Sequence, residues 1–393
     1  LMPRSPHVSP RIAGLSSSVF SRLAASIAQI DGERFPLHVG DTWRAPATGA
    51  HLSDFTEASH PGMHRYTRPQ GHPELLAALA EVRGCDPART LVTSGATGGL
   101  SAVAGTVVDP GDEVVILGPH WPLISGIVRC AHGIAKVVPF FDRLDAALAE
   151  HGTADKAVAA LLGDAIGPST VALYINTPNN PTGKVLSAPV LAALAAVART
   201  HNLWLWSDEV YDHYTFAGKH LKVSSFAPER TFSAWSFSKA YGIAGARCGT
   251  IEVPDVPGLW DEVRKSAMHS VYQAPTVAQL AGARLLRTGD DWLAESRAAY
   301  QQIGWWAADA LGLDRPEGGT FLFVDVASAL DPALPDDEAL TAFLLRCIEQ
   351  GLILAPGDSC GPTYGRHVRL CFTSAPPDAV RRGVAVLAGL LGR

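Results

Sequence analysis

The chain has 393 residues, of which 47% are hydrophobic and 18% charged, and its formal net charge is -6. This composition favours a large buried core and argues against a disordered chain. A mildly acidic chain without a long basic run is also a poor match for nucleic acid phosphates. We expect no membrane span, because no apolar stretch reaches the roughly 20 residues that a helix needs to cross a bilayer.

The cysteines and histidines suggest neither a disulfide framework nor a metal site. The six cysteines are scattered without a Cys-x-x-Cys pair, which favours reduced thiols in a cytoplasmic enzyme. His60 and His64 have helical spacing, but Pro61-Gly62 between them would break a helix, and no Cys or carboxylate cluster lies nearby in the sequence. We therefore predict that no metal is bound.

Short apolar runs alternate with helical stretches along most of the chain. Pro10–Gln29 has a helical period, and we expect it to pack on the C-terminal part. Further along, we predict in order a strand at Thr90–Ser94, a helix at Thr97–Val108, strands at Glu113–Leu117 and Val171–Asn176, a helix at Ser187–Thr200, and strands at Leu203–Ser207 and Arg230–Ser236. Such alternation predicts an α/β fold with a mostly parallel sheet that helices cover on both faces.

The pattern changes after Gly289. There we predict a helix at Trp292–Leu311, a strand at Thr320–Val326, a helix at Glu338–Gln350 and a strand at Val368–Phe372. Because single cores stop growing near about 250–300 residues, the chain should form two domains. We predict a large domain at residues 46–288 and a smaller α+β domain that joins residues 1–45 to residues 289–393.

Ligands of an open α/β sheet bind at the carboxyl ends of its strands. One such end here carries Gly95, Ala96 and Thr97, between a predicted strand and a predicted helix. Glycine lets the backbone approach a ligand, and the free amides at a helix N-terminus favour an anion such as phosphate. The same small residues also serve an ordinary tight turn, so both interpretations stand.

Three other strand ends carry polar side chains. Lys239 follows an apolar strand, where it is either a surface lysine or a buried amine with a lowered pKa, suited to Schiff-base chemistry. Asp208 ends another apolar strand and, if buried, needs a partner such as a protonated ring nitrogen or an arginine. The loop at residues 176–183 is either a simple turn or a rigid support that holds Asn180 as a hydrogen-bond donor.

Taken together, these motifs resemble those of the fold-type I pyridoxal-phosphate enzymes of the aspartate aminotransferase superfamily, in its class I/II branch. The matching segments, in order, are Arg-Tyr-Thr-Arg-Pro-Gln-Gly around Tyr66, Asn-Thr-Pro-Asn-Asn-Pro-Thr-Gly at 176–183, Ser-Asp-Glu-Val-Tyr at 207–211, Ser-Phe-Ser-Lys-Ala-Tyr-Gly at 236–242 and Val-Arg-Leu-Cys-Phe around Arg369. The resemblance spans nearly the whole chain. It implies a seven-stranded sheet in the large domain.

The resemblance implies pyridoxal phosphate as the cofactor and assigns residues around its ring. Lys239 matches the lysine that forms the internal aldimine and moves the Cα proton. Asp208 matches the carboxylate that pairs with the pyridinium nitrogen and makes the ring an electron sink. Tyr211 and Asn180 match the groups that hydrogen-bond the phenolic oxygen. Trp121 matches the aromatic residue that stacks on the ring, although it would also fit as an ordinary core tryptophan.

The resemblance also assigns residues to the phosphate and to the substrate. The expected phosphate ligands are Gly95, Ala96, Thr97, Ser236, Ser238 and Arg247. Tyr66 matches a tyrosine that reaches the phosphate of the neighbouring subunit, which implies a homodimer. Arg369 matches the arginine that binds the substrate α-carboxylate, and Gly40 and Asn180 match further contacts of that carboxylate.

Two positions depart from the family pattern. After Gly40 the chain continues with Asp41-Thr42-Trp43-Arg44, and Trp43 and Arg44 either line the substrate side-chain pocket or form a loop with a surface cation. Cys360 stands where the family usually has phenylalanine, and the smaller side chain would widen the pocket.

The function that the resemblance implies is amino transfer from an L-amino acid to a 2-oxo acid, by a ping-pong mechanism through the Lys239 aldimine. A pyridoxal-phosphate-dependent lyase, cyclase or decarboxylase on the same scaffold is the alternative. We do not expect a non-catalytic sensor, because such regulators usually carry a fused DNA-binding domain and the N-terminal arm here is too short and not basic enough.

Overall fold

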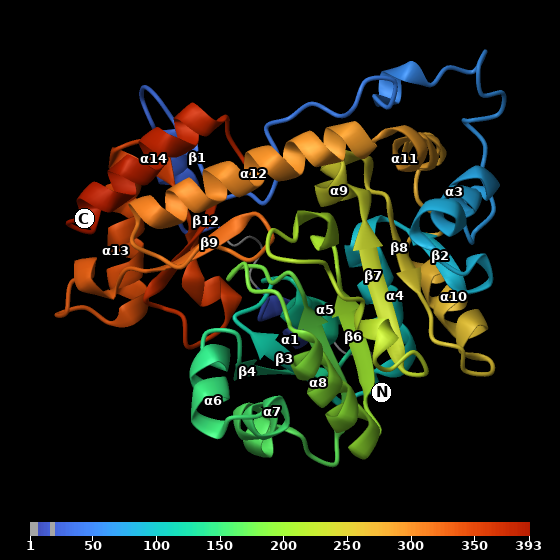
Figure 1. The fold of residues 1–393 in the computed structure, drawn as a ribbon, viewed down its shortest axis with the longest axis horizontal. Helices are drawn as coiled ribbons and strands as arrows, with labels where there is room; N and C mark the ends of the chain where they lie inside the picture. Colours follow the sequence, from blue (N-terminus) through green and yellow to red (C-terminus); the bar gives the residue numbers. More distant parts are fainter. Residues whose placement is uncertain (1–6, 16–19) are drawn as a thin grey trace.

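The computed structural model describes residues 7–15 and 20–393, which build one seven-stranded sheet and one three-stranded sheet (Figure 1). The strands of the larger sheet, in spatial order, are β2 (Thr90–Thr93), β8 (Gly249–Glu252), β7 (Thr231–Ser236), β6 (Trp204–Asp208), β5 (Thr170–Asn176), β3 (Glu113–Gly118) and β4 (Ile134–Pro139). β8 runs antiparallel to β2 and β7, and the other neighbouring strands are parallel. The predicted α/β fold with a mostly parallel seven-stranded sheet is confirmed.

The central strands are apolar along their whole length because both faces of the sheet are covered. On β5, Leu173 and Ile175 point into one core, and Ala172 and Tyr174 into another. This is the alternation expected of a buried strand, whose successive side chains point to opposite faces. The helices of the large domain are α3 (Pro73–Arg83), α4 (Gly95–Val107), α5 (Ile124–Cys130), α6 (Leu144–His151), α7 (Ala154–Leu162), α8 (Ala188–Thr200), α9 (Phe237–Ala240), α10 (Leu259–Ser270) and α11 (Thr276–Thr288).

The smaller domain combines both ends of the described chain. Its three-stranded sheet has the order β11 (Ala355–Pro356), β12 (His367–Cys371) and β9 (Phe321–Asp325), and β1 (Phe35–Pro36) pairs with β10 (Leu352–Ile353). Three helices pack here: α12 (Asp290–Ala310), α13 (Asp336–Glu349) and α14 (Pro377–Leu390). One core joins Phe35 and Leu37 to side chains of all three helices. The boundaries at residues 46 and 288 stay a prediction, which this shared core supports.

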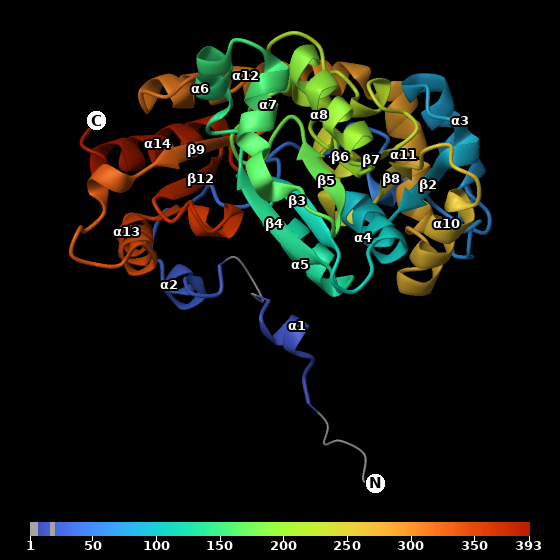
Figure 2. The same ribbon diagram turned by 90° about the horizontal axis from the view of Figure 1, so that it is seen from below.

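The N-terminal segment differs from its prediction. It holds two short helices, α1 (Pro10–Ala13) and α2 (Ala24–Ala28), and part of the predicted helical stretch, residues 16–19, lies outside the described residues. α2 contacts α13, and α1 contacts α5. Figure 2 shows that α1 projects below the main body of the molecule. Arg11 of α1 donates to the Cys130 carbonyl at 3.4 Å. The prediction that the whole segment packs on the C-terminal part is therefore wrong for α1, whose polar contact is with the large domain.

Short 3₁₀ helices complete the structure at Leu52–Asp54, Pro87–Arg89, Gly163–Ala165, Asp212–Tyr214, Val223–Ser225, Ala244–Ala246, Ala327–Ala329 and Gly357–Cys360. Within residues 7–15 and 20–393, no helix has both the length and the apolar character that crossing a membrane requires.

Candidate active site

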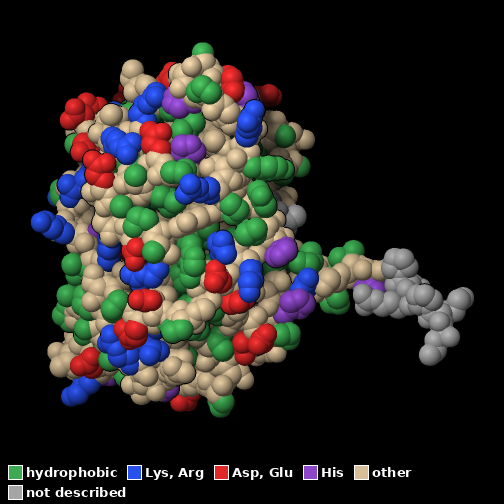
Figure 3. Space-filling view, turned by 90° about the vertical axis from the view of Figure 1, so that its right-hand side faces the viewer, with side chains coloured by type: hydrophobic (Ala, Val, Ile, Leu, Met, Phe, Trp, Pro, Cys, Tyr) green, Lys and Arg blue, Asp and Glu red, His purple; other side chains and the backbone are tan. Residues whose placement is uncertain are grey.

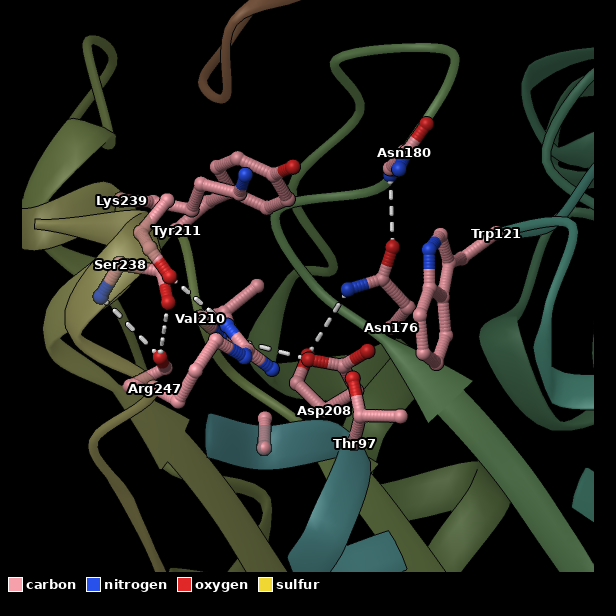
Figure 4. A pocket seen from close by; sticks show the side chains of 13 residues that line it. Thr97, Trp121, Asn176, Asn180, Asp208, Val210, Tyr211, Ser238, Lys239 and Arg247 are labelled. Carbon is pink, nitrogen blue, oxygen red and sulfur yellow. Dashed lines mark hydrogen bonds between the residues drawn. The ribbon is translucent and has the colours of Figure 1, made fainter. Parts of the chain in front are cut away.

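A cavity opens at the carboxyl ends of β5, β6 and β7 (Figure 4). The parallel register places Asn176 opposite Asp208, and Asp208 opposite Ala234, two residues before the end of β7, so the carboxyl ends of these strands lie at one edge of the sheet. The residues that line the cavity are Ala96, Thr97, Trp121, Asn176, Asn180, Asp208, Val210, Tyr211, Ser236, Ser238, Lys239, Ala244 and Arg247. Most of the residues that the sequence predicts for the cofactor are thus brought together.

Asp208 is the buried acid of this cavity. Only 4% of its surface is exposed, and the Tyr174 hydroxyl donates to its Oδ2 at 2.7 Å. Burial raises the pKa of the Asp208 carboxyl to about 6, although the hydrogen bond from Tyr174 opposes that rise. Burying the charged Asp208 carboxylate costs free energy, and a positively charged partner inside the cavity would offset that cost.

Lys239 lies across the cavity from Trp121, on the first turn after β7 (Figure 4). Ser236 caps this turn by accepting a hydrogen bond from the Ser238 amide at 3.1 Å. The Lys239 amino group donates to the Gly40 carbonyl, so it contacts the segment that follows β1. Burial lowers the pKa of Lys239 from its ordinary value, which favours the neutral, nucleophilic amine.

An anion-binding cradle forms the end of the cavity nearest α4. Ala96 and Thr97 lie in the first turn of α4, whose amides lack intrahelical acceptors. Arg247 crosses this turn and donates to the Ser94 carbonyl at 3.3 Å. Gly95 has φ +69°, and a Cβ there would lie 2.6 Å from Arg247 Nη2, so only glycine lets the guanidinium come this close. Gly95 therefore leaves room for the Arg247 guanidinium and does not line the cavity itself.

Arg369 extends the site into the small domain. It is 7% exposed, and its guanidinium carbon lies 4.5 Å from the centre of the Phe321 ring. Its Nη1 donates to Asn180 Oδ1 and its Nη2 to the His38 carbonyl, both at 3.0 Å. Among the described residues, its buried Nε has no hydrogen-bond partner. A guanidinium held in this way keeps donors free for an anion.

Gly40 lies against the same aromatic ring. A Cβ at residue 40 would come within 2.7 Å of Phe321 Cζ, so a larger residue would push into the ring that supports Arg369. Tyr211, which lines the cavity, also packs edge-on to Phe321, with ring centres 5.8 Å apart. Burial raises the pKa of Tyr211, so its phenol stays protonated and able to donate a hydrogen bond.

Two of the predicted site residues that do not line this cavity are exposed at the surface. Tyr66 is 82% exposed and contacts Tyr272, with ring centres 5.1 Å apart. Trp43 is 38% exposed, and its amide donates to the Thr373 carbonyl at 3.0 Å. Next to it, Arg44 pairs with Glu295 at 2.8 Å. The loop after Gly40 is therefore attached to α12 by a charged pair.

Cys360 is fully buried and does not belong to the lining of this cavity; its carbonyl accepts a hydrogen bond from the His120 amide at 3.0 Å. In the part of the chain that the structure describes, no group of three His, Cys, Asp or Glu side chains is arranged to hold a metal ion.

Three of the lining residues, Asn176, Val210 and Ala244, had no role assigned to them from the sequence. Asn176 is the last residue of β5; its Nδ2 donates to the Asp208 carbonyl at 2.9 Å and its Oδ1 accepts from the Asn180 amide at 2.6 Å. Its position at a strand end, as the first residue of the 176–183 motif, was a usable signal. Val210 lies within the 207–211 motif but is apolar, and Ala244 is an apolar residue outside the quoted motifs.

The fold and the cavity define an α/β enzyme with a lysine, a buried acid and an anion cradle at the strand ends. Comparison with known proteins agrees. The family described as aminotransferase class I and II matches residues 41–387. An aspartate/prephenate aminotransferase of Thermus thermophilus is 31% identical over 344 residues, which are 84% of each chain. An arginine–pyruvate transaminase of Pseudomonas aeruginosa is 31% identical over 98% of each chain.

Solved structures show the same likeness. A mutant of the aspartate aminotransferase of Thermus thermophilus superposes with a TM-score of 0.83 at 28% identity and covers 98% of this chain and 100% of its own. The chain belongs to the class I and II aminotransferases. It is a pyridoxal-phosphate-dependent transferase that acts on amino acids and 2-oxo acids, and the lyase, cyclase and decarboxylase alternatives are not favoured.

The cavity suits this cofactor on its own chemistry. A pyridine nitrogen needs an acid that stays close and ionised, an aldehyde needs an amine, and a phosphate needs amides and a cation. Asp208, Lys239 and the cradle of Ala96, Thr97 and Arg247 offer these three groups around one cavity. The free amides of the first α4 turn and the Arg247 guanidinium have the donors and charge that such a phosphate requires.

Proposed function

We propose that the chain moves an amino group from an L-amino acid to a 2-oxo acid in two half-reactions, with Lys239 as the residue that transfers the proton. The observation that carries the proposal is that Lys239 and Asp208 share one buried cavity, beside an arginine bonded to Asn180 of that cavity. When bound, pyridoxal phosphate supplies an aldehyde that takes the amino group and a ring that accepts the electron pair left at Cα.

Lys239 has two tasks in this proposal. Its Nζ would hold the cofactor aldehyde in the absence of substrate, and as a free amine it would act as the general base and acid that moves the substrate Cα proton. Both tasks need the neutral amine, and burial of Lys239 favours that form. The Gly40 carbonyl, which accepts a hydrogen bond from Nζ, orients the amine.

The other lining residues hold the cofactor in place. Asp208 would pair with the ring nitrogen, while Tyr211 and Asn180 would donate to the phenolic oxygen. Trp121 would stack on the ring. The Ala96 and Thr97 amides would hold the phosphate, with Ser236, Ser238 and Arg247 supplying hydroxyls and positive charge.

Arg369 binds the substrate α-carboxylate. Its Nη atoms are already oriented by Asn180 and the His38 carbonyl, and each still has a second hydrogen to donate. Gly40 lets its own backbone come close to this carboxylate because it has no side chain to meet Phe321. Trp43 lies two residues beyond Asp41 on this segment, and we propose that it borders the substrate side chain.

The enzyme works as a homodimer in which Tyr66 reaches the phosphate of the neighbouring site. Tyr66 and Tyr272 form an exposed aromatic pair, and a second copy of the chain would cover it. Figure 3 looks onto the side that carries α3, α10 and α11, where hydrophobic side chains lie between charged ones of both signs.

The cytoplasm is the compartment that we propose. All six cysteines are free, and five of them are buried as thiols. Thiols stay reduced in the cytoplasm, whereas secreted domains convert them to disulfides. Cell fractionation of the native host would check this, and recovery of the protein outside the cytoplasmic fraction would contradict it.

The decisive experiment loads the protein with pyridoxal phosphate and supplies a panel of amino acids with a 2-oxo acid. The panel should include aspartate, arginine, kynurenine and aromatic amino acids, because relatives are named for them. We expect a new amino acid and a new 2-oxo acid in equal amounts. Lys239→Ala should abolish this transfer, whereas Lys265→Ala, at an exposed lysine paired with Glu262, should not. Release of ammonia without amino transfer would contradict the proposal.

A further inference from the structure

Tyr174 is a buried tyrosine whose hydroxyl is bonded to Asp208 of the site. It lies on β5, two residues before Asn176, and is 0% exposed. Its hydroxyl donates to Asp208 Oδ2 at 2.7 Å, from the neighbouring strand. It is not among the residues that line the cavity. An aliphatic side chain would serve as well for packing in this core, so the hydroxyl needs another explanation.

Hydrogen-bond donors to the buried Asp208 carboxylate favour its charged form. The Val210 amide is 3.4 Å from Oδ1, a long contact, so Tyr174 provides the short hydrogen bond. Burial raises the pKa of Asp208 to about 6. The hydrogen bond from Tyr174 opposes that rise most, the Val210 amide and the charge of Lys239 also lower the pKa, and Glu209 raises it. Tyr211 and Arg247 face the same cavity. Without the Tyr174 proton, the balance shifts toward a neutral carboxyl near physiological pH.

We propose that Tyr174 is a positioning residue for the cofactor ring, whose hydroxyl keeps Asp208 ionised and turned toward the ring nitrogen. This inference rests on the proposed function, because it requires pyridoxal phosphate in this cavity. Tyr174 strengthens the contact between Asp208 and the ring without touching the ring itself. A purely structural tyrosine would affect every ligand of the cavity equally.

The test compares pyridoxal phosphate with its analogue that has carbon in place of the ring nitrogen. Both form the same covalent bond and carry the same phosphate, so the ratio of their affinities isolates the Asp208 contact. In Tyr174→Phe we expect this ratio to fall about tenfold, since a hydrogen bond to a charged group is lost. The acid limb of pyridoxal phosphate affinity should move by about one pH unit to higher pH relative to the unsubstituted protein.

The matched control is Tyr364→Phe. Tyr364 is 2% exposed and donates to Asp142 Oδ1 at 2.9 Å, so it repeats the tyrosine–aspartate pair outside the cavity. It should change neither the affinity ratio nor the acid limb. In a second variant, 3-fluorotyrosine replaces Tyr174; its more acidic hydroxyl is a stronger donor and should move the acid limb to lower pH. This variant keeps the hydroxyl and tests the proposal even if Tyr174→Phe does not fold.

Two results would overturn the inference. An equal loss of affinity for both cofactors in Tyr174→Phe would give Tyr174 a structural role only. An unchanged ratio and acid limb, in either variant, would mean that Asp208 does not depend on the hydroxyl. Failure of the proposed function is distinguishable, because the unsubstituted protein would then not bind pyridoxal phosphate at all.

Discussion

Asn180 Oδ1 accepts a hydrogen bond from Arg369 Nη1 at 3.0 Å, and this bond joins the loop after β5 to strand β12 of the small domain. Asn176 continues the connection, because it accepts from the Asn180 amide and donates to the Asp208 carbonyl. One series of hydrogen bonds thus runs from the arginine proposed for the substrate to the acid proposed for the cofactor. Orientation of the two ligands relative to each other depends on this series.

The first prediction concerns Arg369. Arg369→Lys should raise KM for the amino acid by about 10- to 100-fold, because an ammonium cannot bind a carboxylate at two points. Steady-state kinetics with the preferred donor would measure this. Arg366→Lys is the control, since Arg366 makes an exposed pair with Asp336 just before the same strand.

The coupling between Asn180 and Arg369 can be measured as well. If their hydrogen bond orients the guanidinium, the effects of Asn180→Ala and Arg369→Lys on kcat/KM should not add in the double variant. Additive effects would mean that the two residues act independently.

The second prediction concerns Gly95. Gly95→Ala should displace Arg247 from the cradle and weaken pyridoxal phosphate binding by about tenfold or more, since a charge-assisted contact to phosphate is lost. Titration of the apoprotein with the cofactor would show this. Gly84→Ala imposes the same backbone strain at φ +67° without a described atom within 4 Å of the new Cβ, so it should lower stability but not cofactor affinity. Equal affinities in the two variants would contradict the prediction.

The third prediction concerns acid stability. Arg83 binds Asp212 at 2.8 Å, and both side chains are nearly buried. Burial alone would raise the pKa of Asp212, but the Arg83 guanidinium outweighs it and the pKa falls to about 2. A carboxyl whose folded pKa is depressed stabilises the fold above its unfolded pKa of about 4, and that stability is lost as the pH falls toward 2.

The size of this contribution is about 2 kcal/mol. Urea unfolding followed by tryptophan fluorescence at pH 7 and pH 3 should show a smaller loss on acidification in Asp212→Asn than in the unsubstituted protein. The variant should be less stable at pH 7, because it leaves the buried Arg83 charge without its counter-ion. An identical pH dependence in both proteins would show that this pair does not control acid unfolding.

The fourth prediction concerns the shared site. Tyr66→Phe should weaken cofactor binding by about tenfold, through loss of a hydrogen bond to phosphate. When Tyr66→Phe and Lys239→Ala subunits are combined in one dimer, the site with an intact Lys239 receives an intact Tyr66 from its partner. High cofactor affinity should then return at half of the sites. If mixing restores nothing, Tyr66 does not act across subunits.

The strand order along the chain could be predicted because apolar runs are a local property. The predicted Val171–Asn176 and Arg230–Ser236 became β5 and β7 within one residue at their ends. β4 and β8 were not predicted. β4 is an edge strand with mostly half-buried residues, so it lacks the long apolar run of the central strands. β8 has four residues and depends on β2 and β7 for its hydrogen bonds.

The residues of the candidate site also divide into those that the sequence indicated and those that it did not. Lys239, Asp208 and Asn180 stand at strand ends, and motif order was enough to bring them to notice. No sequence pattern indicated a role for Tyr174, because it lies inside an apolar run, where an ordinary core aromatic residue would also be expected. Its partner lies 34 residues away on another strand.

The sequence by itself was enough to predict the central strands, the family and the candidate residues for the chemistry, since each depends on neighbours along the chain. Only the tertiary structure decided that Tyr174 meets Asp208, that Arg44 is held by Glu295 and that Tyr66 remains exposed. Those outcomes depend on strand register and on the packing of segments far apart in sequence. Contacts of that kind are selected by the free energy of the whole fold and not by any local pattern.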